Sequence, residues 1–267
     1  GDYFSWRSGF IVPGILLIIV TAIGYRFLQD SPKSLGLPSI SSWKKETDLK
    51  LVSKNFKEVL NNQLKIVKYP SIWILGLASS TMYVTRYAIN SWGILYLQEI
   101  RGFSLVEAGS IIGLNTFTGI IGCVAYGFIS DKYFDARRPP VTLMFGIVEI
   151  ASLFLIFFGP DSTVVLTIAF LIYGFTLSGL LAVLGGLFAI DIAPKNISGA
   201  AMGFIGLFSY IGAALQEKIS SVLIKTSTEN DTSELLYNFD DAIIFWVFAS
   251  IVSFLLSLAL WNKKTED

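Results

Sequence analysis

The sequence predicts an all-α integral membrane protein with seven transmembrane helices, and three observations lead to this fold class. The first is composition: 53% of the 267 residues are hydrophobic, only 15% are charged, and the mean hydropathy is +0.64. The second is that the apolar residues gather in runs long enough to cross a bilayer as helices. The third is that prolines and short polar stretches separate these runs.

The expected helices occupy residues 9–28, 71–100, 105–130, 140–158, 163–192, 197–224 and 241–261. Pro70 directly precedes the second run, and Pro139 and Pro140 open the fourth. Pro160 and Pro194 fall in short links, where a ring that cannot continue a helix ends one and begins the next.

Residues 29–70 form the long polar stretch between the first two runs, and they divide the chain into three parts. Residues 1–28 are interpreted as the last helix of an N-terminal half, residues 29–70 as an inter-bundle loop, and residues 71–267 as a six-helix C-terminal bundle. Within the loop, residues 48–67 carry apolar side chains near helical spacing, which indicates that part of this stretch lies along the membrane surface or along the inner face of the protein. Such a layout is expected of a twelve-helix chain that begins at its sixth helix.

The distribution of positive charge predicts the orientation. With residues 29–70 on the cytoplasmic side, fifteen of the twenty Lys and Arg residues are cytoplasmic, four lie on the opposite side, and Arg86 lies within the membrane. The positive-inside rule therefore places the long loop and the C-terminus in the cytoplasm.

The composition argues against an enzyme and against a metal or cofactor site. The chain has no histidine, and its single cysteine, Cys123, can form neither an intrachain disulfide nor a zinc site. No nucleophile and base pair, cluster of metal ligands or phosphate-binding loop stands out in the sequence.

Arg86 is the residue that most strongly suggests a function. A guanidinium near the centre of a bilayer costs ~2.5–3.5 kcal/mol, so it must face protein or water and it marks a functional site by default. Helical spacing places Ser79, Tyr83, Asn90 and Gly93 on the same face. The alternative interpretation is that Arg86 pairs with a buried acid and only holds helices together.

Four stretches together resemble a known family. GFISDKYFDARRPP (residues 127–140) is similar to a loop motif of the major facilitator superfamily. RFLQDSPKSLGLPSI (26–40), VTRYAINSWGILYLQEIRGFSL (84–105) and DIAPKNISGAAMGFIGLFSYIGAAL (191–215) resemble its organophosphate:phosphate antiporters. The run TRYAINSWG is most similar to the branch of hexose-phosphate transporters and hexose-phosphate sensors.

The resemblance implies a transporter in the bacterial inner membrane that exchanges a sugar phosphate, with glucose-6-phosphate expected, for inorganic phosphate. Two six-helix halves would rock about a central site, and Arg86 matches the arginine that binds the phosphoryl group in this family. Tyr83 and Asn90 are expected to hydrogen-bond phosphate or sugar hydroxyls, with hydrogen bonding between helices as the alternative. A second hypothesis is a sensor that binds the same ligand without transporting it and signals to a partner protein.

The loop motif provides a second set of candidates, which the resemblance places at the cytoplasmic gate. Gly127 is expected to allow close helix contact, Asp131 to cap or pair across the loop, and Lys132 and Arg137 to hold the cytoplasmic side. Asp191 is expected to act structurally at the same gate.

Further residues are interpreted with alternatives left open. The resemblance makes Lys218 a candidate for substrate choice, although solvated charges at a helix end also explain Lys218 and the adjacent Glu217. Glu149 is preferred as a structural or neutral acid over a proton carrier or a partner of Arg86. Asn115 is preferred as a helix contact, and residues 199–203 form a GxxxG pair that is expected to allow close helix approach.

Overall fold

A computed structural model describes residues 7–29, 32–38, 64–194, 197–228 and 235–261 of the chain. The chain divides into two compact units, Gly1–Val52 and Ser53–Asp267. Most of the helix expected at residues 48–67 lies outside the described residues.

The first unit contains one long helix, α1 (Ser8–Phe27), followed by a short 3₁₀ turn, η1 (Pro32–Leu35). Twenty residues at 1.5 Å each span ~30 Å, which matches the hydrocarbon thickness of a bilayer. No residue of α1 is buried within this unit, and apolar side chains cover all sides of the helix. A helix of this kind is suited to lipid or to packing against other membrane helices.

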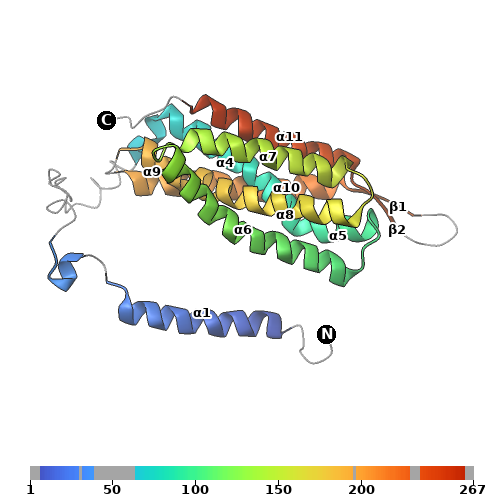
Figure 1. Cartoon of the computed structure of the whole chain (residues 1–267), viewed down its shortest axis with the longest axis horizontal. Helices are drawn as coiled ribbons and strands as arrows, with labels where there is room; N and C mark the ends of the chain where they lie inside the picture. The colour runs from blue at the N-terminus through green and yellow to red at the C-terminus, as the bar shows by residue number, and fades with distance from the viewer. Residues whose placement is uncertain (1–6, 30–31, 39–63, 195–196, 229–234, 262–267) are drawn as a thin grey trace. The chain divides into compact units, whose positions relative to one another are not determined.

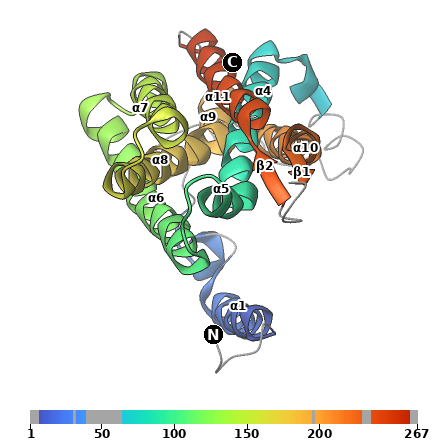
Figure 2. The same cartoon turned by 90° about the vertical axis from the view of Figure 1, so that its right-hand side faces the viewer.

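The second unit is a bundle of membrane-length helices (Figures 1 and 2). After a short 3₁₀ turn, η2 (Lys65–Lys68), its helical segments are α4 (Pro70–Tyr87), η3 (Ala88–Trp92), α5 (Gly93–Glu99), α6 (Leu105–Tyr133), α7 (Arg138–Phe158), α8 (Thr163–Ala182), η4 (Val183–Leu187), α9 (Phe188–Ile192), α10 (Ser198–Leu223) and α11 (Asp240–Ala259). Helix α4 packs against α10 and α11, α8 packs against α6 and α7, and α7 also contacts α11. A buried apolar core runs through these contacts.

Six described helices are long and apolar enough to cross a membrane: α1, α6, α7, the continuous segment Thr163–Ile192, α10 and α11. The seventh expected span is present as a helix from Pro70 to Glu99 that a π-helical turn, η3, divides into α4 and α5. Hydroxyl side chains and Arg86 make this helix more polar than the others. The prediction of an all-α membrane protein is confirmed.

Local sequence signals explain where the helices begin. Pro70 occupies the first turn of α4, where a missing N–H costs nothing. Ser104 and Glu107 form a capping box on α6: the Glu107 N–H donates to Ser104 Oγ, and the Ser104 N–H donates to Glu107 Oε2. The start of α7 lies at Arg138, two residues before the predicted start, because Pro139 and Pro140 both fit the first turn.

Glycines bring α6 and α8 into backbone contact. A Cβ on Gly122 would lie 1.8 Å from the carbonyl oxygen of Phe175, and one on Gly174 would lie 2.1 Å from the carbonyl oxygen of Asn115. Asn115 is therefore a helix contact, as expected. Gly127 and the GxxxG pair at residues 199–203 were expected to play this role, but hypothetical Cβ atoms there meet nothing within 4 Å in the described chain.

A short antiparallel hairpin, which the sequence analysis did not predict, lies between α10 and α11. Strands β1 (Lys225–Thr228) and β2 (Leu235–Asn238) pair with Lys225 opposite Asn238 and Thr226 opposite Tyr237. The hairpin marks one end of the bundle, called the hairpin end below, and α9 marks the opposite α9 end (Figure 1). An ion pair of 2.6 Å between Lys225 Nζ and Asp241 connects β1 to the start of α11 and raises the pKa of Lys225.

Candidate substrate-binding site

Arg86 lies in the last turn of α4, half-buried and flanked by aromatic rings. Its guanidinium carbon is 5.4 Å from the centroid of the Tyr83 ring and 5.7 Å from that of Tyr87. The two rings are stacked with their centroids 6.1 Å apart. A cation over aromatic faces is stabilised by their quadrupoles while its N–H groups stay available to a ligand.

A third tyrosine reaches this group from α10. The Tyr210 ring packs edge-on against Tyr83 at 5.8 Å between centroids, and 64% of its surface is exposed. We call Arg86, Tyr83, Tyr87 and Tyr210 the Arg86 cluster. Sequence reasoning missed Tyr210, because it lies 124 positions after Arg86 and nothing in the periodicity of α10 relates it to α4.

Small residues explain why α10 approaches α4 closely at this level. The hydroxyls of Ser79 and Ser209 are 2.7 Å apart in a buried hydrogen bond between the two helices. A Cβ on Gly212 would lie 2.2 Å from the carbonyl oxygen of Ser80. Ser209 and Gly212 flank Tyr210 on α10, so this contact also fixes the position of Tyr210 beside Tyr83.

The π-helical turn η3 follows Arg86 directly and changes which residues share its face. Continuous helical spacing had placed Asn90 and Gly93 beside Arg86; in the structure Asn90 lies within the wider turn η3, and Gly93 directly follows it. Asn90 is exposed, while Gly93 is buried with Ile112 of α6 3.2 Å from a Cβ built on it. Tyr83 therefore lies beside Arg86 and Gly93 packs against α6, while the role of Asn90 stays a prediction. π turns inside α-helices occur frequently at functional sites.

The alternative of a buried acid paired with Arg86 finds no support. Among the residues that the structure describes, no carboxylate lies within ion-pair distance of its guanidinium. Glu149, the acid considered for this role, instead accepts a hydrogen bond from Ser250 of α11. Among the described residues, Arg86 is thus stabilised by ring contacts and not by a carboxylate.

Lys218 and Glu217 lie nearer the hairpin end of α10. Lys218 is exposed and lies ~12 Å along the helix from Tyr210, since eight residues rise 1.5 Å each. The structure therefore does not bring Lys218 into the Arg86 cluster. Glu217 was interpreted as a solvated charge, but its carboxylate accepts a hydrogen bond from Ser91 of η3 and so connects α10 to the turn that follows Arg86.

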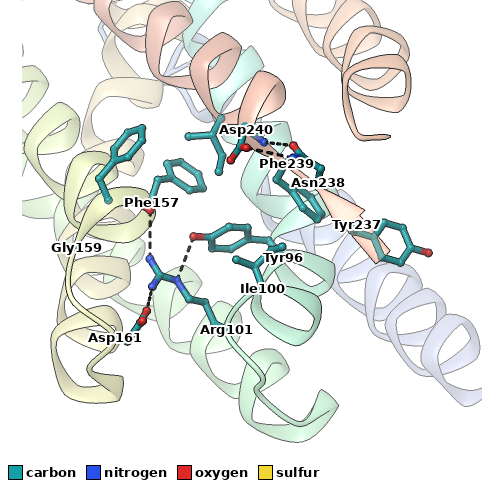
Figure 3. Close-up of a pocket in the computed structure, with 12 residues that line it drawn as sticks. Tyr96, Ile100, Arg101, Phe157, Gly159, Asp161, Tyr237, Asn238, Phe239 and Asp240 are labelled. Carbon is teal, nitrogen blue, oxygen red and sulfur yellow. Dashed lines mark hydrogen bonds and ion pairs between the residues drawn. The ribbon is translucent and has the colours of Figure 1, made fainter. Parts of the chain in front are cut away.

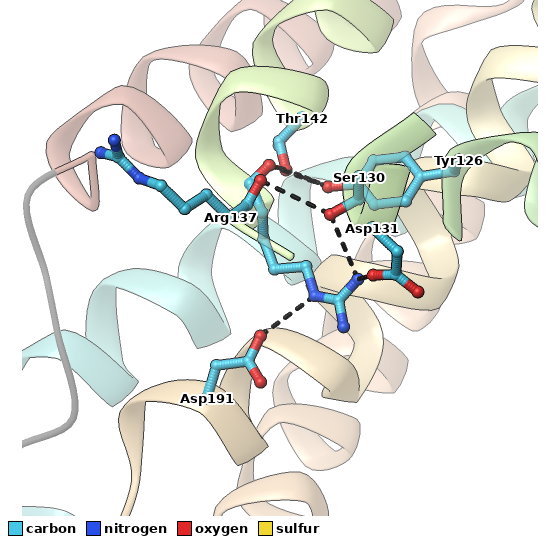
Figure 4. Close-up of polar contacts among 7 residues, drawn as sticks. Tyr126, Ser130, Asp131, Arg137, Thr142 and Asp191 are labelled. Carbon is cyan, nitrogen blue, oxygen red and sulfur yellow. Dashed lines mark hydrogen bonds and ion pairs between the residues drawn. The ribbon is translucent and has the colours of Figure 1, made fainter. Parts of the chain in front are cut away.

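A second polar group lies at the α9 end, where the loop between α6 and α7 meets α9 (Figure 4). The Arg138 guanidinium donates to Asp191 at 3.1 Å and to Asp131 at 3.4 Å. Its Nη1 also donates to Ser130 Oγ at 3.3 Å. Asp131 lies near the end of α6 and Asp191 near the end of α9, and one arginine binds both carboxylates.

That arginine is Arg138, and Arg137, which was expected to hold the cytoplasmic side, takes no part in these contacts. Arg138 is the first residue of α7, while Arg137 precedes the helix in an extended conformation and points away from both aspartates (Figure 4). Lys132 lies outside the group, with its Nζ 5.0 Å from the centroid of the Phe128 ring. The loop turns sharply through Asp135 and Ala136, whose φ angles are 49° and 61°.

An arginine also organises the hairpin end (Figure 3). Arg101 pairs with Asp161, and its Nε–H donates to the Tyr96 hydroxyl oxygen at 3.2 Å. It also donates to the carbonyl oxygens of Ile156 and Phe157 at 2.9 and 3.2 Å. These carbonyls belong to the last turn of α7, so Arg101 caps that helix. The neighbouring hollow of about 470 Å³ contains both Asp161 and Asp240, which disfavours an anion there.

No group of three or more metal-ligating side chains occurs within the described ranges. The Arg86 cluster is therefore the site whose chemistry best suits a ligand. A fork of N–H donors surrounded by tyrosine rings and hydroxyls matches a phosphoryl group.

Comparison with known proteins gives the family. Residues 1–216 match the family profile described as the Major Facilitator Superfamily. The chain belongs to the major facilitator superfamily. Membership of this transporter family agrees with the prediction of a non-enzymatic membrane protein.

Three relatives indicate the branch within the superfamily. The chain is 33% identical over 223 residues to the membrane sensor protein UhpC of Escherichia coli, covering 80% of the chain and 49% of the relative. It is 29% identical over 283 residues to a glycerol-3-phosphate transporter of Bacillus subtilis, covering 99% and 59%. It is 32% identical over 232 residues to a probable hexose phosphate transport protein of Chlamydia trachomatis, covering 80% and 50%.

These relatives match the organophosphate:phosphate antiporter branch, as the sequence motifs predicted. The chain spans about half the length of the curated relatives that it matches. Multi-pass insertion in a membrane follows from the family and from the six apolar helices.

Proposed function

We propose that this chain of the major facilitator superfamily is the C-terminal portion of an antiporter that exchanges a sugar phosphate for inorganic phosphate by alternating access. The observation that carries the proposal is Arg86, a cation in the membrane-spanning bundle that faces tyrosine rings and has no carboxylate partner among the described residues. An intramembrane cation without a protein counter-ion is suited to an anionic substrate.

The substrate assignment has support from the relatives and from the site. One relative, 30% identical over 223 residues, is named as a hexose-6-phosphate:phosphate antiporter of Salmonella typhimurium, and the chain covers 44% of its length. In the site, Arg86 would hold the phosphoryl group, while Tyr83 and Tyr210 provide hydroxyls and rings for the sugar. Glucose-6-phosphate is the sugar phosphate that we propose to test first.

The proposed architecture extends beyond the described residues. Residues 1–28 would be the sixth helix of a twelve-helix protein, residues 29–70 its inter-bundle loop, and residues 71–267 its C-terminal bundle, with an N-terminal half that supplies the rest of the site. We propose the bacterial inner membrane as its location, with the long loop and the C-terminus in the cytoplasm. A reporter that is active only in the cytoplasm, fused to the C-terminus, tests this orientation.

Counterflow in proteoliposomes tests the function. Vesicles of the full-length protein are loaded with phosphate and supplied with labelled glucose-6-phosphate, and Arg86→Lys is compared with Arg137→Lys. Arg86→Lys should abolish counterflow, because a point charge replaces a planar fork of donors. Arg137→Lys is the matched control and should retain it, since Arg137 points away from the polar group at the α9 end (Figure 4).

A sensor is the second candidate, and the similarity to a membrane sensor protein favours it. A sensor would bind glucose-6-phosphate through Arg86 without exchanging it for internal phosphate. Binding without counterflow would refute the antiporter and support the sensor. If the wild-type protein shows neither binding of glucose-6-phosphate nor counterflow, glucose-6-phosphate is refuted as the ligand.

A further inference from the structure

Glu149 is a carboxylic acid in the middle of α7 with none of its surface exposed. One of its oxygens, Oε2, accepts a hydrogen bond from the Ser250 hydroxyl of α11. The other oxygen, Oε1, has no hydrogen-bond partner among the described residues. Glu149 thus has a single donor where an ionised carboxylate offers about four acceptor positions.

The hydroxyls around Glu149 are already committed elsewhere. Ser253 donates to the carbonyl oxygen of Ala78 at 2.8 Å, and Ser257 donates to the carbonyl oxygen of Ser253 at the same distance. Thr142 donates to the carbonyl oxygen of Arg138 at 2.9 Å. A cavity of about 10 Å³ borders Glu149 and these side chains, which is space for at most one water molecule.

No positive charge compensates Glu149 within the described part of the chain. Helix α11 faces it with serines, and the described acids of α11, Asp240 and Asp241, lie in its first turn. Helix α6 contributes Tyr126, whose hydroxyl is bonded to Thr142. Helix α8 contributes Tyr173, whose hydroxyl donates to the carbonyl oxygen of Thr85 on α4. A buried carboxylate without a paired cation is strongly disfavoured, so the stable form of Glu149 carries a proton.

We propose that Glu149 is a proton-binding site inside the C-terminal bundle, and that proton binding there is linked to anion binding at Arg86. Tyr173 provides the connection, because its hydroxyl donates to the carbonyl oxygen of Thr85 at 3.1 Å, one residue before Arg86. Loss of the proton creates a negative charge in a medium of low dielectric constant near Arg86. That charge opposes binding of phosphate, and by reciprocity bound phosphate opposes loss of the proton.

Infrared difference spectroscopy of the full-length protein in liposomes tests the proton site directly. At neutral pH, where an exposed glutamate is ionised, the wild-type protein should show the C=O band of a protonated carboxyl group. Glu149→Gln should remove this band, and Glu99→Gln, at the exposed end of α5, should leave it unchanged. Ser250→Ala keeps the carboxyl group and should shift the band, because the hydrogen bond to Oε2 is lost.

Two results would overturn the proton site: absence of the band in the wild-type protein, or its persistence in Glu149→Gln. A band that Ser250→Ala fails to shift would also contradict the assignment, and this variant decides the question even if Glu149→Gln does not fold. None of these measurements depends on transport, so they stand apart from the proposed function.

The linkage to Arg86 rests on the proposed function and needs a second measurement. Binding of inorganic phosphate is measured across the alkaline range in the wild-type protein and in Glu149→Gln. As the pH rises and Glu149 loses its proton, the affinity of the wild-type protein for phosphate should fall by ~5-fold or more relative to that of Glu149→Gln. The pH dependence that comes from ionisation of phosphate is the same for both proteins, so it does not affect the ratio of their affinities.

The outcomes separate the two proposals. Equal pH dependence of phosphate binding in both proteins would overturn the linkage. Absence of phosphate binding at every pH would refute the proposed function, while the infrared band would still decide whether Glu149 holds a proton.

Discussion

Replacing Gly122 with alanine tests whether backbone contact between α6 and α8 holds the bundle together. The added Cβ would lie 1.8 Å from the carbonyl oxygen of Phe175, whereas ordinary contact begins at 3.4 Å. The obstacle is backbone, which cannot rotate away as a side chain can. The two helices must therefore separate by ~1.5 Å at this level, and they lose packing along their shared length.

The expected cost follows from these distances. Overpacking of this kind costs ~3 kcal/mol, at the upper end of the usual range, because no rotamer change relieves it. Replacing glycine by alanine in a helix returns ~1 kcal/mol, so the net loss in the free energy of unfolding is ~2 kcal/mol. For a unit the size of Ser53–Asp267, this lowers the midpoint of thermal unfolding by ~4–8 °C.

Gly127→Ala on the same helix is the matched control. A Cβ on Gly127 meets nothing within 4 Å, so only the gain in helix propensity remains. Its midpoint should rise by ~2–4 °C. Thermal unfolding of the purified chain in detergent measures both variants, and equal midpoints for Gly122→Ala and Gly127→Ala would refute the argument from close approach.

Three further predictions concern the α9 end and the Arg86 cluster. Arg138→Gln should lower the free energy of unfolding by ~1–3 kcal/mol through loss of its charged hydrogen bonds to Asp131 and Asp191, whereas Arg137→Gln should change it little; comparable melting of the two variants would contradict this. Ala136→Gly should raise the free energy of unfolding by ~1 kcal/mol in chemical denaturation, because alanine is strained at a φ of 61°; a decrease would show that the loop does not adopt this turn. Tyr210→Phe should retain the ring contact with the cluster and most counterflow, while Tyr210→Ala should raise the KM for glucose-6-phosphate; an unchanged KM in the alanine variant would remove Tyr210 from the site.

The sequence was sufficient for the helices whose ends have strong local signals. Pro70 and the Ser104 and Glu107 pair act within one turn of the chain, so the starts of α4 and α6 fall within a residue of prediction. The site was only partly predictable, because Tyr83 lies one regular α-helical turn before Arg86, whereas Asn90 lies inside a π turn. A turn closed by i to i+5 hydrogen bonds leaves no trace in a hydrophobic pattern read at a period of 3.6 residues.

Other features depend on contacts between distant segments. The choice between Arg137 and Arg138 is decided by where α7 begins, and element boundaries are the least certain part of a sequence reading. The close contact at Gly122 requires knowledge that α8 passes beside it, which the motif at residues 127–140 does not contain. Tyr210 joins the site for the same reason, through the contact of α10 with α4.

Two π turns, η3 and η4, lie near the Arg86 cluster. The segment that contains η3 has a polar contact towards the hairpin end of the bundle, and the segment that contains η4 has one at the α9 end. Turn η3 follows Arg86 and is connected to α10 through Ser91 and Glu217, towards the hairpin end. Turn η4 approaches Tyr83, since a Cβ on Gly185 would lie 4.0 Å from the Tyr83 hydroxyl, and it leads into α9, where Asp191 bonds to Arg138. π turns interrupt the regular i to i+4 ladder and are sites where helices bend. The segments that form the site can therefore bend at the level of the ligand while polar contacts hold them on either side, which is the mechanical property that the proposed exchange of two anions requires.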